Sequence, residues 1–132
     1  MTEDAGLLRF HPTQTAVWFD YNNDGHLDLF IGNESTPGDT NACELFRNNG
    51  NGTFTECARE TGVDAIGYVK AVTAGDYDND GRPDLLLSSR GEFTLLFRNE
   101  GPQPSALLSK PVWQFKNVAI EAGVAEPKHS FP

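Results

Sequence analysis

The sequence predicts an all-β fold built from two four-stranded, propeller-like blades, and three observations lead to this expectation. Much of the first half of the chain recurs in the second half, with Asp20 of one copy corresponding to Asp76 of the other. The recurring unit contains short runs of β-branched and aromatic residues bounded by Gly, Asn and Asp, which is typical of strands. No window keeps the apolar spacing of an amphipathic helix beyond two turns. A unit of this length with about four strands has the size of a propeller blade.

The repeat is best seen in three segments of the first unit that return in the second: Asp20–Asp28 as Asp76–Asp84, Leu45–Asn48 as Leu96–Asn99, and Glu60–Val63 as Glu121–Val124. The spacing between corresponding residues first shrinks and then grows along these segments. Five residues are therefore missing after the second acidic segment, and ten are added within residues 102–111. Length changes of this kind are expected in loops that connect a fixed set of strands.

The repeat also gives the domain organisation that we expect. Asp4–Leu7 resembles the Glu60–Val63 segment and lies one repeat length before it, so the chain is expected to begin within an earlier repeat. The predicted units are residues 1–14 as the tail of a preceding repeat, 15–70 as the first repeat, 71–124 as the second repeat, and 125–132 as the start of a further repeat.

Each repeat is expected to contain two hairpins. The predicted strands are Thr15–Phe19, Leu27–Ile31, Cys43–Asn48 and Thr53–Cys57 in the first repeat, with Ala71–Ala74 and Leu85–Ser88 in the second. The Asn-Gly-Asn-Gly run at residues 49–52 predicts a tight turn, because Asn and Gly tolerate positive φ angles.

The two acidic segments have the pattern of calcium-binding loops. They hold seven of the 19 acidic residues. Calcium takes six to eight oxygen ligands in flexible geometry, and acidic side chains at alternate positions of a tight loop supply them. An Asp-rich turn without a metal is the alternative, but the ligand pattern is kept in both copies. The predicted ligands, with His26 and Arg82 contributing main-chain carbonyls, are Asp20, Asn22, Asp24, His26, Asp28, Asp76, Asp78, Asp80, Arg82 and Asp84. The second loop, with four carboxylates against three, is expected to bind more tightly.

An EF-hand shares the start of this pattern, but it requires a Glu at position 12 and flanking helices. Position 12 is Ile31 in the first loop and Leu87 in the second, and both residues lie in predicted strands. An EF-hand is therefore excluded.

The acidic loop, the Leu-Phe-Arg-Asn segment, the Asn-Gly-x-Gly-Thr-Phe-Thr turn and the Glu-x-Gly-Val segment together resemble the FG-GAP/VCBS repeats of integrin-α-type β-propellers, and most closely the bacterial ones found with ASPIC/UnbV-type domains. The resemblance covers nearly the whole chain. It implies four-stranded blades, calcium in the loop between the first two strands of each blade, an extracellular or cell-surface setting, and ligand recognition at one face. A propeller closes a ring of several blades, so the resemblance applies here to single blades.

Composition narrows the range of partners. The net charge of −9 argues against nucleic acid and anionic membranes, which require basic patches. No apolar run approaches the length of a membrane span, and residues 1–4 lack the start of a signal peptide. If the protein is secreted, we expect its signal to lie outside this chain or to have been removed. The three His residues, His11, His26 and His129, have no zinc-ligand spacing, and catalytic motifs are absent, so an enzyme is not expected.

Two further features suit an extracellular protein. Cys43 and Cys57 would face each other, and could form a disulfide, if the turn between them were centred on Gly50; two buried free thiols are the alternative. Asn33 and Asn51 begin N-glycosylation sequons in predicted loops. Arg47 and Arg98, which recur in the repeat, are expected to pair with nearby acids.

The sequence supports two functions. The first is a calcium-stabilised module that binds or adheres to a protein or glycan ligand. The second is a structural protein whose unclosed blades join further copies of itself, head to tail, in a ring or a filament. Both predict that the chain is a homo-oligomer or part of a longer propeller rather than an isolated monomer, because two blades leave apolar faces uncovered.

Overall fold

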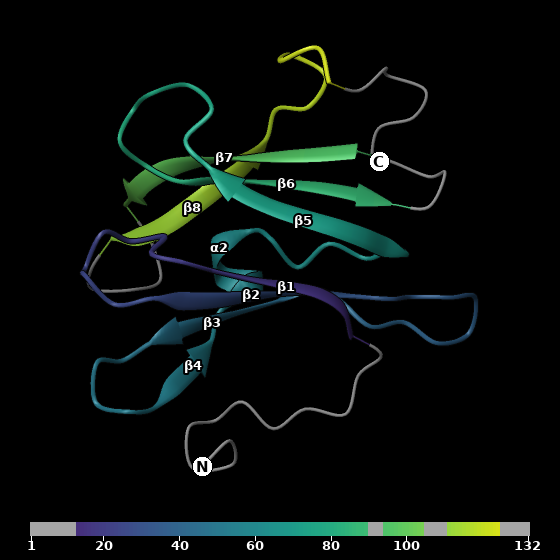
Figure 1. The fold of residues 1–132 in the computed structure, drawn as a ribbon, viewed down its shortest axis with the longest axis horizontal. Helices are drawn as coiled ribbons and strands as arrows, with labels where there is room; N and C mark the ends of the chain where they lie inside the picture. The colour runs from purple at the N-terminus through teal and green to yellow at the C-terminus, as the bar shows by residue number, and fades with distance from the viewer. Residues whose placement is uncertain (1–12, 90–93, 105–110, 125–132) are drawn as a thin grey trace.

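The computed structural model describes residues 13–89, 94–104 and 111–124. The predicted start of a further repeat, and residues 1–12 of the predicted preceding tail, lie outside these ranges. The described residues form two four-stranded antiparallel sheets, each with its strands in sequence order (Figure 1). The expected all-β fold with four strands per repeat is confirmed.

The first sheet consists of β1 (Thr13–Phe19), β2 (Asp28–Asn33), β3 (Glu44–Asn48) and β4 (Phe54–Glu56). The second consists of β5 (Val69–Gly75), β6 (Asp84–Ser89), β7 (Thr94–Gln103) and β8 (Val112–Asn117). Asp28 and Asp84 pair with the last residues of β1 and β5, so the closing acid of each loop is also the first residue of a strand. The added residues of the second repeat partly lengthen β7, which has an irregular register between Asn99 and Gly101.

The turn between β3 and β4 has the geometry that its sequence predicts. Gly50 and Gly52 have φ angles of 81° and 88°. The Asn49 N–H donates a hydrogen bond of 2.9 Å to the Thr53 carbonyl and closes the turn.

A short helix, α2 (Ala58–Thr61), follows β4 and was not predicted. It ends at Gly62, whose φ of 86° gives the left-handed cap that ends many helices. A single turn is too short to show helical periodicity, which explains why the sequence pattern missed it. Figure 1 shows α2 lying between the two sheets.

The main core lies where one sheet stacks on the other. Phe30 and Leu45 of the first sheet and Leu85 and Leu87 of the second are fully buried in it, together with Val63 after α2. Leu96, with Val118 and Ala119, forms a separate small cluster on the other side of the second sheet. Each sheet therefore places one apolar face in the shared core and turns its other face away from it.

The expected disulfide between Cys43 and Cys57 is not formed, because both residues are free, buried thiols. The strand register pairs Asn48 with Phe54, which centres the turn on residue 51 rather than on Gly50. The Cys57 N–H therefore donates to the carbonyl of Leu45 rather than meeting Cys43. Burial raises the pKa of each thiol to about 11.

The two sequons also differ from each other. Asn33 is the last residue of β2 rather than part of a loop, and it is fully buried. Its amide nitrogen donates to the Ala42 carbonyl and to Glu44, each at 2.9 Å. That nitrogen is the atom that a glycan would modify, and the structure does not present it to solvent. Asn51 lies exposed in the hairpin turn, as expected, and its glycosylation remains a prediction.

Candidate metal centre

The two acidic loops connect equivalent strands, β1 to β2 and β5 to β6. Each makes a tight turn through two residues with positive φ: Asn23 (54°) and Gly25 (85°) in the first, Asn79 (60°) and Gly81 (82°) in the second. Asn and Gly are the residues that adopt this conformation at least cost. The recurring Asn and Gly of the sequence are thus explained by the path of the backbone.

The first acid of each loop holds the turn from inside. The carboxylate of Asp20 accepts hydrogen bonds from the N–H groups of Asp24 (3.2 Å) and Gly25 (2.8 Å). Asp76 accepts the same pair of bonds, from Asp80 (3.1 Å) and Gly81 (2.7 Å).

The acid at the fifth position of each loop repeats in the same way. Asp24 accepts a 2.9 Å bond from the His26 N–H, and Asp80 accepts one of the same length from the Arg82 N–H. The two loops therefore share their internal hydrogen bonds as well as their sequence pattern.

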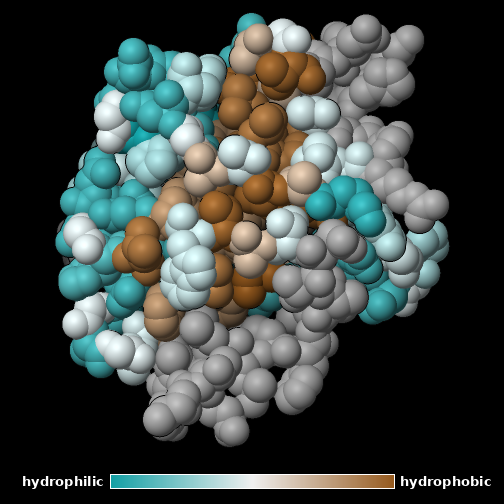
Figure 2. Space-filling model, viewed as in Figure 1, coloured by the Kyte–Doolittle hydropathy of each residue, from teal (hydrophilic) through white to brown (hydrophobic). Residues whose placement is uncertain are grey.

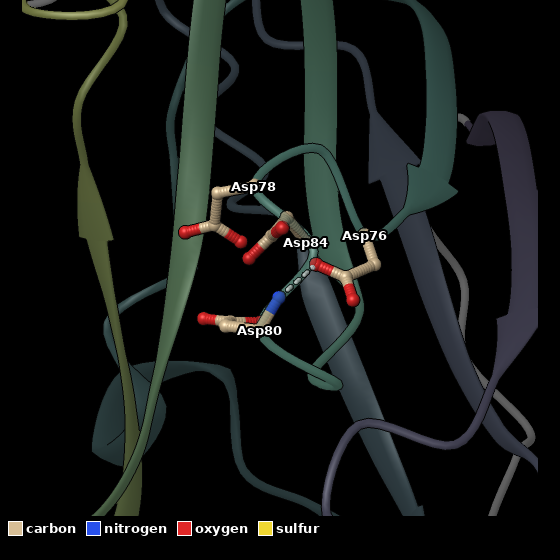
Figure 3. A group of neighbouring side chains, drawn as sticks. All are labelled: Asp76, Asp78, Asp80 and Asp84. Carbon is tan, nitrogen blue, oxygen red and sulfur yellow. Dashed lines mark hydrogen bonds between the residues drawn. The ribbon is translucent and has the colours of Figure 1, made fainter.

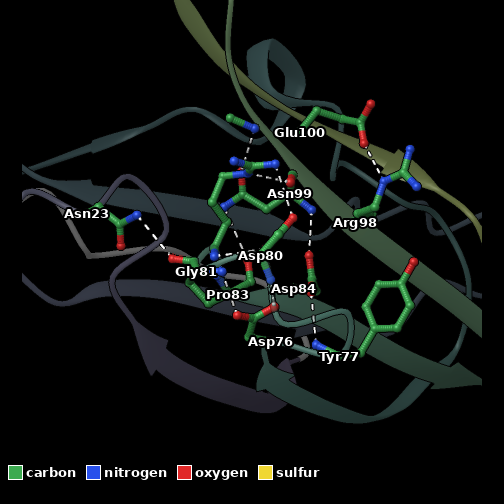
Figure 4. Close-up of polar contacts among 12 residues, drawn as sticks. Asn23, Asp76, Tyr77, Asp80, Gly81, Pro83, Asp84, Arg98, Asn99 and Glu100 are labelled. Carbon is green, nitrogen blue, oxygen red and sulfur yellow. Dashed lines mark hydrogen bonds and ion pairs between the residues drawn. The ribbon is translucent and has the colours of Figure 1, made fainter.

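The closing acids are buried, with Asp28 and Asp84 at 0% and 1% exposure. Asp28 accepts hydrogen bonds from the N–H groups of Tyr21 (3.1 Å) and Asn48 (2.7 Å). Asp84 accepts the equivalent bonds from Tyr77 (3.1 Å) and Asn99 (2.7 Å), as Figure 4 shows.

Sequence reasoning found the closing acids but missed the two asparagines that orient them. The available signal was the recurrence of Leu-Phe-Arg-Asn, which ends at Asn48 in the first copy and at Asn99 in the second.

The carboxylates of each loop converge. Asp76, Asp78, Asp80 and Asp84 each place one oxygen within 4.8 Å of the others, and Figure 3 shows the four carboxylates pointing toward one another. Asp20, Asp24 and Asp28 form the equivalent group of three in the first loop.

The fourth predicted side-chain ligand of the first loop joins this group. The amide of Asn22 lies 3.1 Å from Asp20 and 3.1 to 3.3 Å from the two oxygens of Asp24. Its nitrogen can donate to both acids, or its oxygen can complete a ring of four oxygens around a cation. The side chains of both loops thus fit the hard oxygen donor set that calcium requires.

The electrostatics of the loops favour a cation. Burial, together with smaller repulsion from neighbouring acids, raises the pKa of Asp28 and of Asp84 to about 6. Partial desolvation and the charge of Asp80 also raise the pKa of Asp78. Carboxylates this close repel one another unless a proton or a metal ion neutralises them.

His26 and Arg82, predicted to contribute carbonyls, occupy equivalent positions but have different side chains. The Arg82 guanidinium lies 3.1 Å from Asp80, and its Nε donates a 3.0 Å bond to the Asn99 carbonyl. A positive charge therefore stands beside the second loop at the position where the first loop has an imidazole.

The expected arginine pairs are present. Arg47 lies 3.7 Å from Glu60, and Arg98 lies 2.5 Å from Glu100. The Arg47 pair lies in a cleft of about 580 Å³ beside the first loop, which Asn22, Asn49 and Trp113 also line. This cleft spans the two sheets, because Trp113 belongs to β8.

The fold and the paired acidic loops define a class: an all-β repeat protein with one acidic loop per four-stranded unit. Residues 20–87 match the FG-GAP-like repeat family, and the chain belongs to this family. It is also similar to cartilage acidic protein 1 of Xenopus tropicalis, at 35% identity over 65 residues. The match covers 48% of this chain and 9% of that relative, so the chain corresponds to a small part of the relative's length.

Among the residues that the structure describes, no helix has the length and apolar character that a membrane span requires.

Proposed function

We propose that this chain is a calcium-binding, extracellular repeat module that recognises a protein or glycan ligand. The observation that carries the proposal is the recurrence of the acidic loop with the same internal hydrogen bonds and the same convergence of carboxylates. Membership of a family of repeat modules and similarity to a protein named for cartilage support a non-enzymatic, extracellular role.

Calcium would have a structural task here. The first loop would hold it with Asp20, Asn22, Asp24, Asp28 and the His26 carbonyl, and the second with Asp76, Asp78, Asp80, Asp84 and the Arg82 carbonyl. The ion would neutralise the clustered carboxylates and fix the connection between the first two strands of each sheet. Loops that are fixed in this way can form a rigid surface for a ligand.

The cleft beside the first loop is the candidate ligand site. It has the volume of a small-molecule or side-chain pocket and combines an aromatic ring, an ion pair and several amides. Such a surface suits a polar ligand such as a glycan or a protein loop.

Calorimetric titration with calcium tests the metal proposal. Two sites per chain are expected, and Mg²⁺ should bind much more weakly because it requires a smaller octahedral shell. Asp20→Asn with Asp24→Asn should remove one site, whereas Asp39→Asn, an exposed acid outside both loops, should remove none. An absence of calcium binding to the folded chain would refute the proposal.

The alternative function, head-to-tail assembly, is favoured by the equivalence of the two sheets. The first sheet presents Val17, Phe19, Phe30 and Leu45 to the core, and their repeat equivalents Thr73, Gly75, Leu86 and Leu96 line an open apolar groove of about 470 Å³ on the second sheet. Tyr21 is 2% exposed and its equivalent Tyr77, also in the groove, is 47% exposed. The groove is therefore an uncovered copy of the face that is buried between the sheets.

The opposite face of the first sheet carries Trp18, Leu29 and Phe46, of which Trp18 is exposed and the other two are buried. Trp18, at 52% exposure, is the equivalent of Ala74, which packs against the core from the second sheet. Trp18 contacts Phe54 of β4 edge to face, at 6.0 Å between ring centroids. Figure 2 shows hydrophobic residues gathered in a band that runs from the second sheet toward the first. The groove and the face that carries Trp18 are the repeat equivalents of the two halves of the internal contact, which a second copy of the chain would repeat.

A further inference from the structure

A buried path of hydrogen bonds connects the two acidic loops. Asp28 of the first loop accepts a bond from the Tyr21 N–H. The Tyr21 carbonyl accepts a 2.7 Å bond from the side-chain amide of Asn99, whose own N–H donates a 2.7 Å bond to Asp84 of the second loop. All four residues are at most 2% exposed. The closing acids of the two loops are thus joined through one tyrosine backbone and one asparagine.

A comparison of Asn99 with its repeat equivalent, Asn48, shows which of these bonds belong to both repeats and which does not. The backbone N–H of each asparagine donates to the closing acid of its own loop. The side-chain oxygen accepts a 2.9 Å bond from the N–H of the glycine two residues later. The side-chain nitrogen donates to the carbonyl of the residue that precedes the closing acid. Among the side-chain bonds of the two asparagines, the bond to Tyr21 is made by Asn99 and not by Asn48. It runs from β7 of the second sheet to the loop that follows β1 of the first, and it spans 78 positions of sequence.

The backbone of Tyr21 is part of the first loop, so its position depends on the conformation of that loop. It lies between Asp20 and Asn22, two of the proposed ligands, so the peptide groups on both of its sides are fixed when that loop closes on an ion. Its ring is held by the second sheet, with ring-centroid distances of 6.4 Å to Trp113 and 6.2 Å to Phe115. The contacts of Tyr21 thus provide a route from the first loop to Asn99.

We propose that Asn99 is a positioning residue that couples the two calcium sites, so that filling one loop favours filling the other. This inference rests on the proposed calcium binding. Closing the first loop fixes the Tyr21 carbonyl, which holds the Asn99 amide and, with it, the N–H that orients Asp84. The second loop then loses less conformational freedom when it binds its own ion.

The coupling is measured by comparing calcium affinity at one loop with the other loop active or disabled. Asp20→Asn with Asp24→Asn disables the first loop and leaves Asp28 and Tyr21 in place. The dissociation constant of the second loop should then rise by about fivefold or more, a typical coupling between sites. Because binding linkage is reciprocal, Asp76→Asn with Asp80→Asn should weaken the first loop by the same factor.

The role of Asn99 is tested by repeating the comparison in Asn99→Ala and in the matched variant Asn48→Ala. The factor should fall below about twofold in Asn99→Ala and persist in Asn48→Ala, which removes the same local bonds without the bond to Tyr21. Equal effects of the two variants would overturn the proposal.

A measurement on the unsubstituted Asn99 covers the case in which Asn99→Ala does not fold. In the chain with the second loop disabled, filling the first loop with calcium should shift the NMR signals of the Asn99 side-chain amide. Unchanged signals, or unchanged affinity of one loop when the other is disabled, would overturn the coupling and leave calcium binding intact. Failure of both loops to bind calcium would overturn the coupling together with the proposed function.

Discussion

At the scale of single residues, a charge that does not belong to the proposed ligands affects which of the two loops should bind calcium more tightly. The second loop has four carboxylates and the first has three, which on ligand charge alone would make the second tighter. Arg82 lies 3.1 Å from Asp80 and offsets one of those charges, whereas the first loop has His26 at the same position. The side chain of a residue that was predicted to offer only its carbonyl therefore opposes the expected ranking.

Arg82→His should tighten calcium binding at the second loop, because it removes a cation beside Asp80 and reproduces the residue of the first loop. We expect a severalfold decrease in the dissociation constant at low ionic strength, and a smaller one at high salt, where exposed charges are screened. Asp78→Asn should act in the opposite direction. Calorimetry in which Arg82→His weakens the site would contradict this account.

The two thiols give a second prediction at this scale. Since burial raises the pKa of both Cys43 and Cys57 to about 11, few thiolates form at about pH 8. The folded protein should react very slowly with a thiol reagent, and the unfolded protein should release two reactive thiols rapidly. Unfolded protein that shows no reactive thiol before reduction would indicate the disulfide that the register argues against.

At the scale of elements, the sequence predicted what is repeated and missed what depends on register or on single turns. The strands and acidic loops were found because the segments that form them occur twice in the chain. Helix α2 was not predicted because a single turn has no periodicity. The predicted pairing of the cysteines was wrong because a small shift in the turn separates Cys43 from Cys57. Burial of Asn33 depends on Ala42 and Glu44, and no short pattern encodes those contacts.

The acidic loops give a prediction that separates the effect of backbone strain on stability from the effect of packing. Gly81 has a φ of 82° and Gly75 does not have a positive φ, yet a methyl group added at either would meet no atom within 4 Å. Gly81→Ala should therefore cost about 1–2 kcal/mol from the left-handed conformation alone and weaken calcium binding. Gly75→Ala should change the free energy of unfolding little. Equal denaturation midpoints for the two variants would show that the turn is not strained.

At the scale of the whole molecule, the open groove of the second sheet and the exposed Trp18 on the outer face of the first predict head-to-tail association. We expect the pure chain, with calcium, to sediment faster than a single copy of the chain would. Leu86→Glu in the groove, or Trp18→Glu on the other face, should each leave monomers, whereas Ile66→Glu, an exposed apolar residue outside the groove, should not.

A mixture of these two variants tests the direction of the contact. Each variant keeps the face that the other has lost, so an equimolar mixture should form heterodimers that cannot grow. A mixture that stays monomeric would contradict the heterologous contact, and so would a single variant that still assembles.

The central claim is that calcium holds the paired acidic loops and, through them, both sheets. Thermal unfolding of the chain in about 1 mM calcium and in excess chelator tests it most directly. An ion that binds the folded state alone stabilises it by several kcal/mol per site at saturating concentrations. For a chain of this size, the melting temperature in chelator should fall by roughly 10 °C or more, with little recovery in Mg²⁺. A melting temperature that is the same with and without calcium would contradict the account.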